Sequence, residues 1–514
     1  MPSGTPAPAL HYALLLFADF GHIAPTLGVT RELLRRGHRV TYVVDERFAA
    51  VVEETGARAV TYTSARGDFY RSADPTADQL AEDGYRLLVD TVHTVFPTAM
   101  EAFAADRPDV VLYDFETVAA GRVAARLLDA VPVQVCPSHA ANESFSMRAQ
   151  MWDADHPVMA EGAKVMIGFM GEHGIGLDEM ARYGAEWDLR NLVFLPRAFQ
   201  IEGDTFDDRF AFVGPTFSEP PADSARWTPP GDGRRVALVS LGTEAGDRAG
   251  FFRQCAQAFD PAGWHVVMTL GRDSDPAHLG PLPEHVEAHS WLPHPQVLPY
   301  ADVFVCHAGM GSLMEALHYG TPVVALPRAH ELALSAQQLE RCGVGRAQPR
   351  TGLTAPALAE AVAGLLADPG TPAALARMRE AVRTAGGGGA APPPPRPRGG
   401  GAPRGAAAGG GPAGPGRGRR PGCGGGPAGG GGPSAPPTCW RPGRPAATRS
   451  RPRADPPRTR VVPGTSSVPG TTTCARILSV SAAASRTRSL WRCCGRSSRR
   501  SAPGTPRSRT SARW

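Results

Sequence analysis

The stretch that decides the fold is residues 12–44, YALLLFADFGHIAPTLGVTRELLRRGHRVTYVV. Its first part, residues 12–17, is a continuous apolar run that predicts a buried strand. Residues 25–36 predict a helix that Gly37 closes, and residues 39–44 predict a second strand. A strand, a helix and a strand in this order form a βαβ unit with parallel strands and a right-handed crossover.

The same alternation continues to about residue 384. We expect further strands and helices in the following ranges: strands 110–113, 131–136, 235–240, 264–270, 286–289, 303–306 and 322–326; helices 119–128, 249–259 and 312–319. The chain is therefore predicted to be an α/β protein with two Rossmann-like, doubly wound domains, residues 1–215 and 235–384, joined by a linker at 216–234. Ligands bind such sheets at the carboxyl ends of strands, so the two domains should face a cleft.

The charge of the chain is unevenly distributed. Residues 385–514 hold 23 Arg, one Asp and no Lys or Glu, so a net charge of +5 leaves the preceding part acidic. The basic total is therefore no sign of nucleic-acid binding. The tail is too poor in apolar residues to build a core and is expected to be disordered. A basic arm and a shifted reading frame through GC-rich coding sequence are both open, and the abrupt change of composition favours the second.

Cysteine spacing and hydropathy bear on the location of the protein. Cys136, Cys255, Cys306 and Cys342 have no paired spacing, which argues against a disulfide framework or a zinc site. Residues 12–17 are too short to span a membrane and precede no small-residue cleavage site. We expect a soluble cytoplasmic protein without a membrane partner, and the sequence leaves its oligomeric state open.

The turn after the first strand carries a candidate base. Gly21 is expected to let the chain turn sharply, so that His22 stands at the carboxyl end of the strand. A neutral imidazole there could take a proton from a hydroxyl group. Asp114, which follows the strand at 110–113, could reach His22 and fix its tautomer. The alternative, that His22 caps a turn and Asp114 caps a helix, stays open.

A second candidate site lies at residues 303–319, where a strand runs into a glycine-bearing turn and then a helix. Free amides and the helix dipole make such a turn an anion site suited to a diphosphate. His307, Ser312 and Glu315 surround the turn. Trp291, sixteen positions before His307, could stack on a base.

Together these motifs resemble the signature of nucleotide-sugar-dependent glycosyltransferases of the GT-B fold, in particular the bacterial macrolide glycosyltransferases. The resemblance covers residues 11 to about 384. It rests on motifs that follow one another in family order: Gly21-His22-Ile-Ala-Pro25, Ser240-Leu-Gly-Thr243, Trp291, His307-Ala-Gly-Met-Gly-Ser312, Glu315-Ala-Leu and Gly320-Thr-Pro322.

The resemblance implies a role for each matching residue. His22 would be the general base and Asp114 its partner. The nucleotide sugar would be held by Thr243, Trp291, His307, Gly309, Gly311, Ser312, Glu315 and Glu331. Trp291 would stack on uracil or thymine, Glu315 would accept ribose hydroxyls, and Glu331 would bind the sugar. The helix dipole and His307 would neutralise the leaving diphosphate, so neither a metal nor a cofactor besides the co-substrate is expected.

The implied reaction moves a hexose or deoxyhexose from a UDP- or dTDP-sugar to a hydroxyl of a macrolide-like or other small hydrophobic aglycone, with inversion. Residues 1–215 would bind the acceptor and residues 235–384 the nucleotide sugar. Two alternatives remain, an inactive protein that binds nucleotide or aglycone and a nucleotide-sugar epimerase of the same fold. The helical segment 142–191, with six Met, fits either an acceptor pocket or ordinary core packing.

Three departures from the family pattern qualify the resemblance. His294 and Leu332 each stand where the family usually has Gln. The Gln beside the acid at Glu331 ordinarily binds donor-sugar hydroxyls, so its loss favours a deoxysugar over glucose. The family's terminal helix, which crosses back onto the first domain, has no counterpart in the Gly- and Pro-rich tail.

Overall fold

The computed structural model describes residues 8–65, 76–151, 156–217, 226–242, 249–271, 274–328 and 330–386. All of these residues belong to one compact unit. The tail predicted to be disordered lies outside the described residues from residue 387 onward, and so does any helix after that point.

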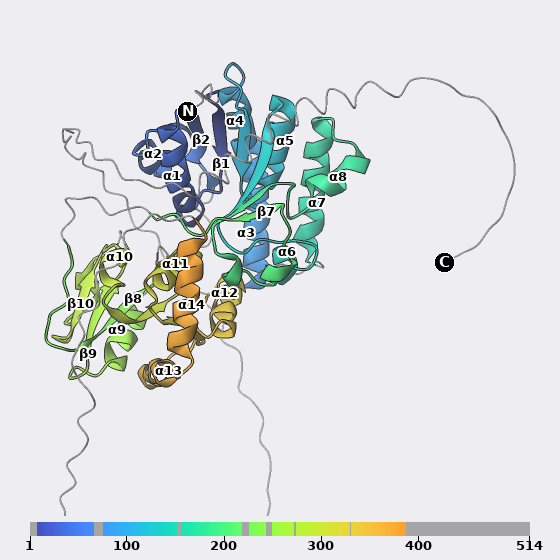
Figure 1. Ribbon diagram of the computed structural model, residues 1–514. Helices are drawn as coiled ribbons and strands as arrows, with labels where there is room; N and C mark the ends of the chain where they lie inside the picture. Colours follow the sequence, from blue (N-terminus) through green and yellow to red (C-terminus); the bar gives the residue numbers. More distant parts are fainter. Residues whose placement is uncertain are drawn as a thin grey trace, which may run out of the picture. The chain divides into compact units, whose positions relative to one another are not determined.

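The first half of the described chain builds a sheet of seven parallel strands in the order β3-β2-β1-β4-β5-β6-β7 (Figure 1). Their bounds are β1 His11–Leu15, β2 Arg39–Asp45, β3 Arg58–Tyr62, β4 Val110–Tyr113, β5 Val131–Cys136, β6 Asn191–Val193 and β7 Phe210–Phe212. The strand order reverses between β1 and β4, where Leu15 lies opposite Tyr113. The residues that follow these two strands therefore meet at a topological switch point.

The second half builds a sheet of six parallel strands in the order β10-β9-β8-β11-β12-β13. The bounds are β8 Arg235–Ser240, β9 Trp264–Thr269, β10 Val286–His289, β11 Ala301–Cys306, β12 Val323–Ala325 and β13 Gly345–Ala347. The switch point lies between β8 and β11, where Ser240 is opposite Cys306. The predicted α/β architecture of two doubly wound halves is confirmed.

Helices cover both faces of each sheet (Figure 1). With the first sheet go α1 Phe20–Arg35, α2 Ala49–Glu53, α3 Ala77–Asp90, α4 Phe96–Ala102, α5 Val118–Leu128, α6 Met147–Met151, α7 Pro157–Glu172 and α8 Leu177–Tyr183. With the second go α9 Ala249–Ala258, α10 His294–Val297, α11 Met310–Tyr319, α12 His330–Arg341, α13 Ala355–Ala367 and α14 Thr371–Thr384. In the described part of the chain, no helix is long and apolar enough to cross a bilayer.

Alternation along β1 explains why both faces need helices. Leu14 packs in one core with Leu27 of α1, whereas Leu15 packs in the opposite core with Phe96 of α4 and Val123 of α5. Successive side chains of a strand point to opposite faces, so an apolar strand such as β1 must be covered on both.

Helix α1 begins five residues earlier than predicted. Asp19 caps it, because its side chain accepts a hydrogen bond of 2.9 Å from the amide of Gly21. Gly21 thus lies in the first helical turn and not in the sharp turn expected of it, and Pro25 stands inside the helix. That prediction was wrong, and His22 is positioned by the first turn of α1.

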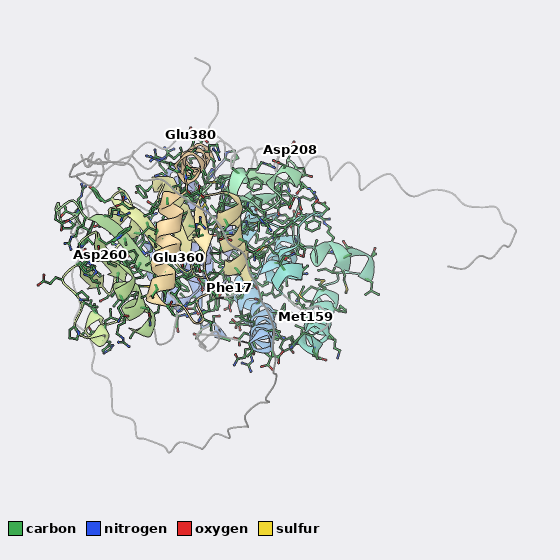
Figure 2. The ribbon with its side chains drawn as sticks, turned by 90° about the horizontal axis from the view of Figure 1, so that it is seen from below. Phe17, Met159, Asp208, Asp260, Glu360 and Glu380 are labelled. Carbon is green, nitrogen blue, oxygen red and sulfur yellow. The ribbon has the colours of Figure 1, made fainter. Side chains whose placement is uncertain are left out.

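Segment 142–191 was expected either to form an acceptor pocket or to pack as ordinary helices, and its methionines fall into two groups. Helix α7, on which Figure 2 labels Met159, packs beside α3. Met166, Met170 and Met180 join the core of the first half, which is ordinary helical packing. Met147 of α6 lies apart from that core, where it packs with Leu334 of α12.

Candidate active site

The two residues that follow β1 and β4 in the candidate site are in contact. Nδ1 of His22 lies 2.9 Å from Oδ2 of Asp114. The Asp114 side chain is fully buried and that of His22 is 15 % exposed. Among the described residues Nε2 of His22 has no hydrogen-bond partner. Because a proton on Nδ1 is donated to Asp114, Nε2 is left as the basic nitrogen.

Backbone amides hold Asp114 in place. Its Oδ2 accepts a bond of 2.8 Å from the amide of Phe17, and its Oδ1 accepts bonds of 3.1 Å and 3.0 Å from the amides of Glu116 and Thr117. Asp114 therefore closes the turn before α5 and also pairs with His22. Asp114 does not cap α5 itself, because the N-cap of that helix is Thr117.

The charge of the pair follows from its surroundings. Burial lowers the pKa of His22, but the charge of Asp114 and their hydrogen bond raise it, and so do the charges of Asp19 and Glu331. The net effect is to raise the pKa of His22 to about 9. The site therefore stabilises the imidazolium form that a general base becomes after it takes a proton. Glu331 of α12 thus acts on His22 through its charge.

A cavity of about 100 Å³ begins at Phe115, the residue after Asp114 in the chain. Phe115, whose ring centroid lies 5.7 Å from that of His22, forms part of its wall. The other lining residues are Glu116, Val118, Gln134, Cys136, His139, Ala140, Ala141, Met147, Arg148, Ala185 and Glu186. Among the described side chains of segment 142–191, Met147 is the methionine that lines this cavity.

Two titratable residues of this cavity, His139 and Glu116, were not predicted from the sequence as site residues. His139 is 3 % exposed, and among the described residues neither of its ring nitrogens has a hydrogen-bond partner. Burial lowers the pKa of His139 to about 3, so its imidazole is neutral. Glu116 has its pKa raised to about 7, mainly by burial. Both follow strands at the same sheet edge as Asp114, and that position is the signal that could have identified them.

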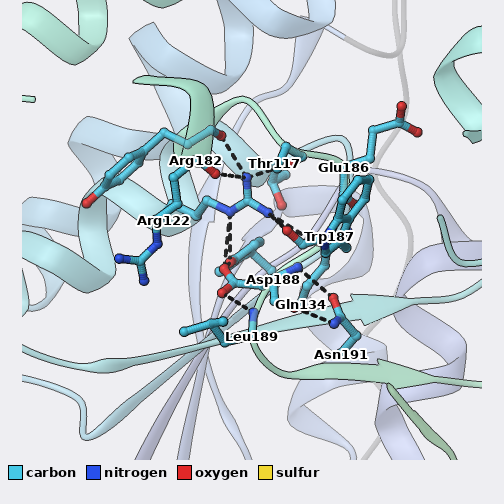
Figure 3. A network of polar contacts seen from close by, with 12 residues as sticks. Thr117, Arg122, Gln134, Arg182, Glu186, Trp187, Asp188, Leu189 and Asn191 are labelled. Atoms are coloured by element: carbon cyan, nitrogen blue, oxygen red, sulfur yellow. Dashed lines mark hydrogen bonds and ion pairs between the residues drawn. The ribbon is translucent and has the colours of Figure 1, made fainter. Parts of the chain in front are cut away.

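A buried guanidinium, that of Arg122, binds the segment that contributes Ala185 and Glu186 to the cavity lining (Figure 3). Nε of Arg122 lies 3.2 Å from Oδ2 of Asp188, and its other nitrogens donate to Oε1 of Gln134 and to backbone carbonyls of residues 182–187. The segment so anchored carries Glu186, whose Oε1 accepts a 2.5 Å hydrogen bond from Ser146.

In the second half, the turn between β11 and α11 is shaped around His307. A Cβ atom at Gly242 would lie 2.7 Å from Cε1 of His307, and one at Gly309 would lie 2.3 Å from its Nε2. The ring therefore fits only because both neighbours are glycine. Ala308, which is fully buried, has a φ of 70°. An L-residue in this region costs about 1–3 kcal/mol, which the surrounding packing offsets.

The first turn of α11 is the expected anion site. Gly309 is the N-cap, and the first helical bond runs from the amide of Leu313 to its carbonyl. The amides of Gly311 and Ser312 precede that bond and have no acceptor within the helix. A Cβ at Gly311 would meet nothing within 4 Å, so a ligand can approach the backbone here.

The remaining predicted donor-site residues are placed as follows. Trp291, after β10, is 43 % exposed, as an aromatic platform must be to receive a base. Glu315 lies one turn into α11 with its side chain 26 % exposed. Glu331 and the half-buried Leu332 are in the first turn of α12. Thr243 lies outside the described residues.

Comparison with known proteins identifies the family. Residues 258–386 match the erythromycin biosynthesis protein CIII-like C-terminal domain. Demethyllactenocin mycarosyltransferase of Streptomyces fradiae is 36 % identical over 391 residues, which are 73 % of this chain and 84 % of that protein. Oleandomycin glycosyltransferase of Streptomyces antibioticus is 35 % identical over 390 residues, 73 % and 87 % of the two chains. The chain belongs to the GT-B glycosyltransferase family that includes these macrolide enzymes.

Solved structures agree with that assignment. The calicheamicin glycosyltransferase CalG4 is 34 % identical to this glycosyltransferase, with a TM-score of 0.67 over 74 % of this chain and 96 % of that one. The glycosyltransferase of kitacinnamycin is 32 % identical, with a TM-score of 0.64 over 74 % and 97 %. The prediction of a natural-product glycosyltransferase with the GT-B fold is confirmed.

Proposed function

We propose that this glycosyltransferase transfers a hexose or deoxyhexose from a UDP- or dTDP-sugar to a hydroxyl of a macrolide-like or other small hydrophobic aglycone, with inversion. The observation that carries the proposal is the His22–Asp114 pair. The neighbouring Phe115 lines a cavity, and a second candidate site lies in the other half of the chain. The names of the two macrolide relatives support an acceptor of that class.

In the proposed reaction, Nε2 of His22 takes the proton of the acceptor hydroxyl. The hydroxyl oxygen forms a bond to the anomeric carbon while the bond from that carbon to the diphosphate oxygen breaks, and the diphosphate leaves with the electron pair. Attack opposite the leaving group inverts the anomeric configuration. Asp114 stabilises the imidazolium and keeps the ring in the tautomer that exposes Nε2.

The donor would lie along α11. Trp291 would stack on the base and Glu315 would accept a hydroxyl of the nucleoside. The diphosphate would be held by Thr243, His307, Gly309, Gly311 and Ser312. Since its negative charge grows as it leaves, the α11 dipole and His307 would neutralise it without a metal ion. Glu331, whose charge is felt at His22, would bind the donor sugar next to the base.

The acceptor would approach from the first half of the chain, as proposed for residues 1–215, with residues 235–384 for the donor. The cavity behind Phe115 would take a few non-hydrogen atoms of the aglycone, and His139 and Glu116 would meet its polar groups. We also propose a cytoplasmic location, where nucleotide sugars are available.

The test is a screen of donors and acceptors by mass spectrometry, followed by the variant His22→Ala. Loss of the base should lower kcat by roughly 10²–10⁴-fold while the Kd for UDP or dTDP stays near that of the wild type. An acceptor that gains the mass of a sugar supports transfer, whereas an altered nucleotide sugar without acceptor would indicate an epimerase. Binding without turnover would indicate an inactive protein. A His22→Ala variant that keeps more than about a tenth of kcat would remove His22 as the base.

A further inference from the structure

A second and larger cavity lies at the opposite edge of the first sheet from His22 and Asp114. Ala130 directly precedes β5, Leu189 lies two residues before β6, and Arg209 directly precedes β7, so the amino ends of these strands border the cavity. His22 and Asp114 follow the carboxyl ends of β1 and β4, and this cavity is therefore separate from the candidate active site. Its volume is about 330 Å³, within the range of about 300–1,000 Å³ typical of small-molecule sites.

Arginine dominates the lining of this cavity. Four of its eleven lining residues are Arg and one is an acid. The four are Arg122, Arg126, Arg182 and Arg209, and the acid is Asp188, which is paired with Arg122. A planar guanidinium group suits the planar or tetrahedral oxygens of a carboxylate, sulfonate or phosphate. We refer to this space as the arginine cavity.

The guanidinium groups differ in how far they are neutralised. The carboxylates that pair with Arg126 and Arg209 lie outside the lining and are 46–58 % exposed: Glu143, Glu179 and Asp207. Exposed pairs of this kind contribute little to stability, so a ligand can compete with them. Among the described residues, the exposed guanidinium of Arg182, in the last turn of α8, forms no hydrogen bond or ion pair. Arg182 is thus the cation that a ligand can meet at no cost in existing contacts.

The remaining lining is mainly apolar. It includes the aromatic residues Tyr183 and Trp187, and Leu189, whose side chain is 57 % exposed. Aromatic side chains and an exposed leucine suit the apolar body of a ligand, whereas the guanidinium groups suit its charged end. The lining therefore fits an amphipathic anion better than a free inorganic one.

One short segment separates the arginine cavity from the 100 Å³ cavity proposed for the acceptor. Ala185 lines both cavities, Glu186 lines the acceptor cavity, and Trp187 lines the arginine cavity. Arg122 also donates to Oε1 of Gln134, and Nε2 of Gln134 donates a hydrogen bond of 2.8 Å to the carbonyl of Glu186 (Figure 3). A ligand that shifts segment 185–187 therefore changes the lining of both cavities.

We propose that the arginine cavity binds an organic anion with a planar aromatic body and one carboxylate or sulfonate group, and that its occupant alters acceptor binding through segment 185–187. The charged group faces Arg182, and the body lies against Tyr183, Trp187 and Leu189. The binding site is independent of the proposed function, whereas the effect on the acceptor rests on it.

The test of binding uses two fluorescent dyes with the same ring systems. Anilinonaphthalene sulfonate carries one negative charge, and phenylnaphthylamine is its uncharged counterpart. Titrations with saturating UDP keep the dyes out of the donor site. An anion of about 21 non-hydrogen atoms that fills such a cavity should bind with a Kd on the order of 10⁻⁵ M. The uncharged dye should bind at least about fivefold more weakly, because it gains nothing from the guanidinium groups.

Two variants with matched controls locate the dye. Arg182→Gln should raise the Kd of the sulfonate about fivefold and leave that of the uncharged dye unchanged. Leu189→Glu places a like charge at the cavity and should raise it about tenfold. Arg377→Gln in α14 and Leu177→Glu in α8 make the same changes at exposed positions outside the lining, and should have no effect. Melting curves establish that each variant is folded.

The site is overturned if both dyes bind the wild type equally, if neither Arg182→Gln nor Leu189→Glu weakens the sulfonate, or if the controls weaken it as much. For the effect on the acceptor, saturating sulfonate should change the acceptor KM of the wild type by about fivefold and that of Leu189→Glu much less. An unchanged wild-type KM would overturn the connection between the cavities. If no acceptor gains a sugar at all, the proposed function is wrong, and the dye titrations still decide whether the arginine cavity binds an anion.

Discussion

Nδ1 of His22 lies 2.9 Å from Oδ2 of Asp114 although 92 positions separate the two residues in the chain. The switch point between β1 and β4 brings them together, and the first turn of α1 aims the imidazole. The distance allows a full hydrogen bond, so the protonation of His22 depends on Asp114.

The pH dependence of catalysis should reveal this dependence. Only neutral His22 can accept a proton, and its pKa is raised to about 9, so kcat/KM should rise with pH and level off above about 9. Asp114→Asn removes the charge that raises the pKa, and the rising limb should move toward the ordinary value of 6.5 while the plateau falls. A rising limb at the same pH in both proteins would show that another group is titrating.

The same pair should make stability depend on pH. The pKa of His22 is higher in the folded chain, about 9, than its ordinary value of 6.5. Its contribution to stability is therefore fully present below pH 6.5 and is lost as the pH rises through about 9. The difference in Tm between the wild type and His22→Gln should be largest at acidic pH and should shrink toward alkaline pH. A constant difference across that range would contradict the pairing.

Gly309→Ala should weaken donor binding. The new Cβ would lie 2.3 Å from Nε2 of His307 and must displace the ring from the turn before α11. We expect Kd for UDP and dTDP to rise at least tenfold, and overpacking of this kind also costs about 1–3 kcal/mol of stability. Gly168→Ala in α7 is the control, because a Cβ there meets nothing within 4 Å. Unchanged nucleotide binding in folded Gly309→Ala would exclude His307 from the donor site.

His139→Leu tests the acceptor cavity. Leucine keeps most of the volume but cannot hydrogen-bond, so an acceptor whose polar group meets His139 should lose about 1–3 kcal/mol of binding, seen as a higher acceptor KM. Nucleotide Kd should not change. His318→Leu is the matched control, since His318 is buried to a similar degree but does not line the cavity. If both variants leave the acceptor KM unchanged, the acceptor does not reach His139.

Leu332→Gln should change the choice of sugar. A donor hydroxyl that faces Leu332 loses its hydrogen-bonding partner at a cost of about 1–3 kcal/mol, whereas a deoxy position loses nothing. The substitution should therefore improve kcat/KM for UDP-glucose relative to a nucleotide-linked deoxysugar, with Glu331 still beside the sugar. An unchanged ratio would mean that position 332 does not contact the sugar.

The bounds of several strands could be predicted from the sequence. The bounds of β4, β5, β8 and β10 agree with the expected ranges. Strand β4 is entirely apolar, and β8 has four apolar residues between Arg235 and Ser240. Strands β6 and β7, which have three residues each, were not predicted. So short a segment shows no recognisable hydrophobic periodicity, and it becomes a strand only by pairing with its neighbours in the sheet.

Site residues that directly follow a strand end could be predicted from the sequence. Site properties that depend on burial could not. His22 and Asp114 could be paired because both follow strands at the switch point. His139 follows β5 at the same sheet edge as Asp114, but its burial could not be predicted, because it depends on the chain around Phe199 and Gln200 folding over it. His294 stood out as a departure from the family pattern, but its contact with Glu315 joins residues 21 positions apart and needs the turn of α11.

The buried Arg122 limits how the enzyme could change to use new acceptors. Arg122 binds the segment that includes Glu186, a residue of the acceptor cavity lining. Arg122 itself does not line this cavity. Breaking its pair with Asp188 would cost about 3–5 kcal/mol, a large share of the stability of an ordinary domain. Selection for broader acceptor use would therefore act against folding if it loosened the segment that Arg122 binds, whereas Phe115 and Met147 line the same cavity outside that segment.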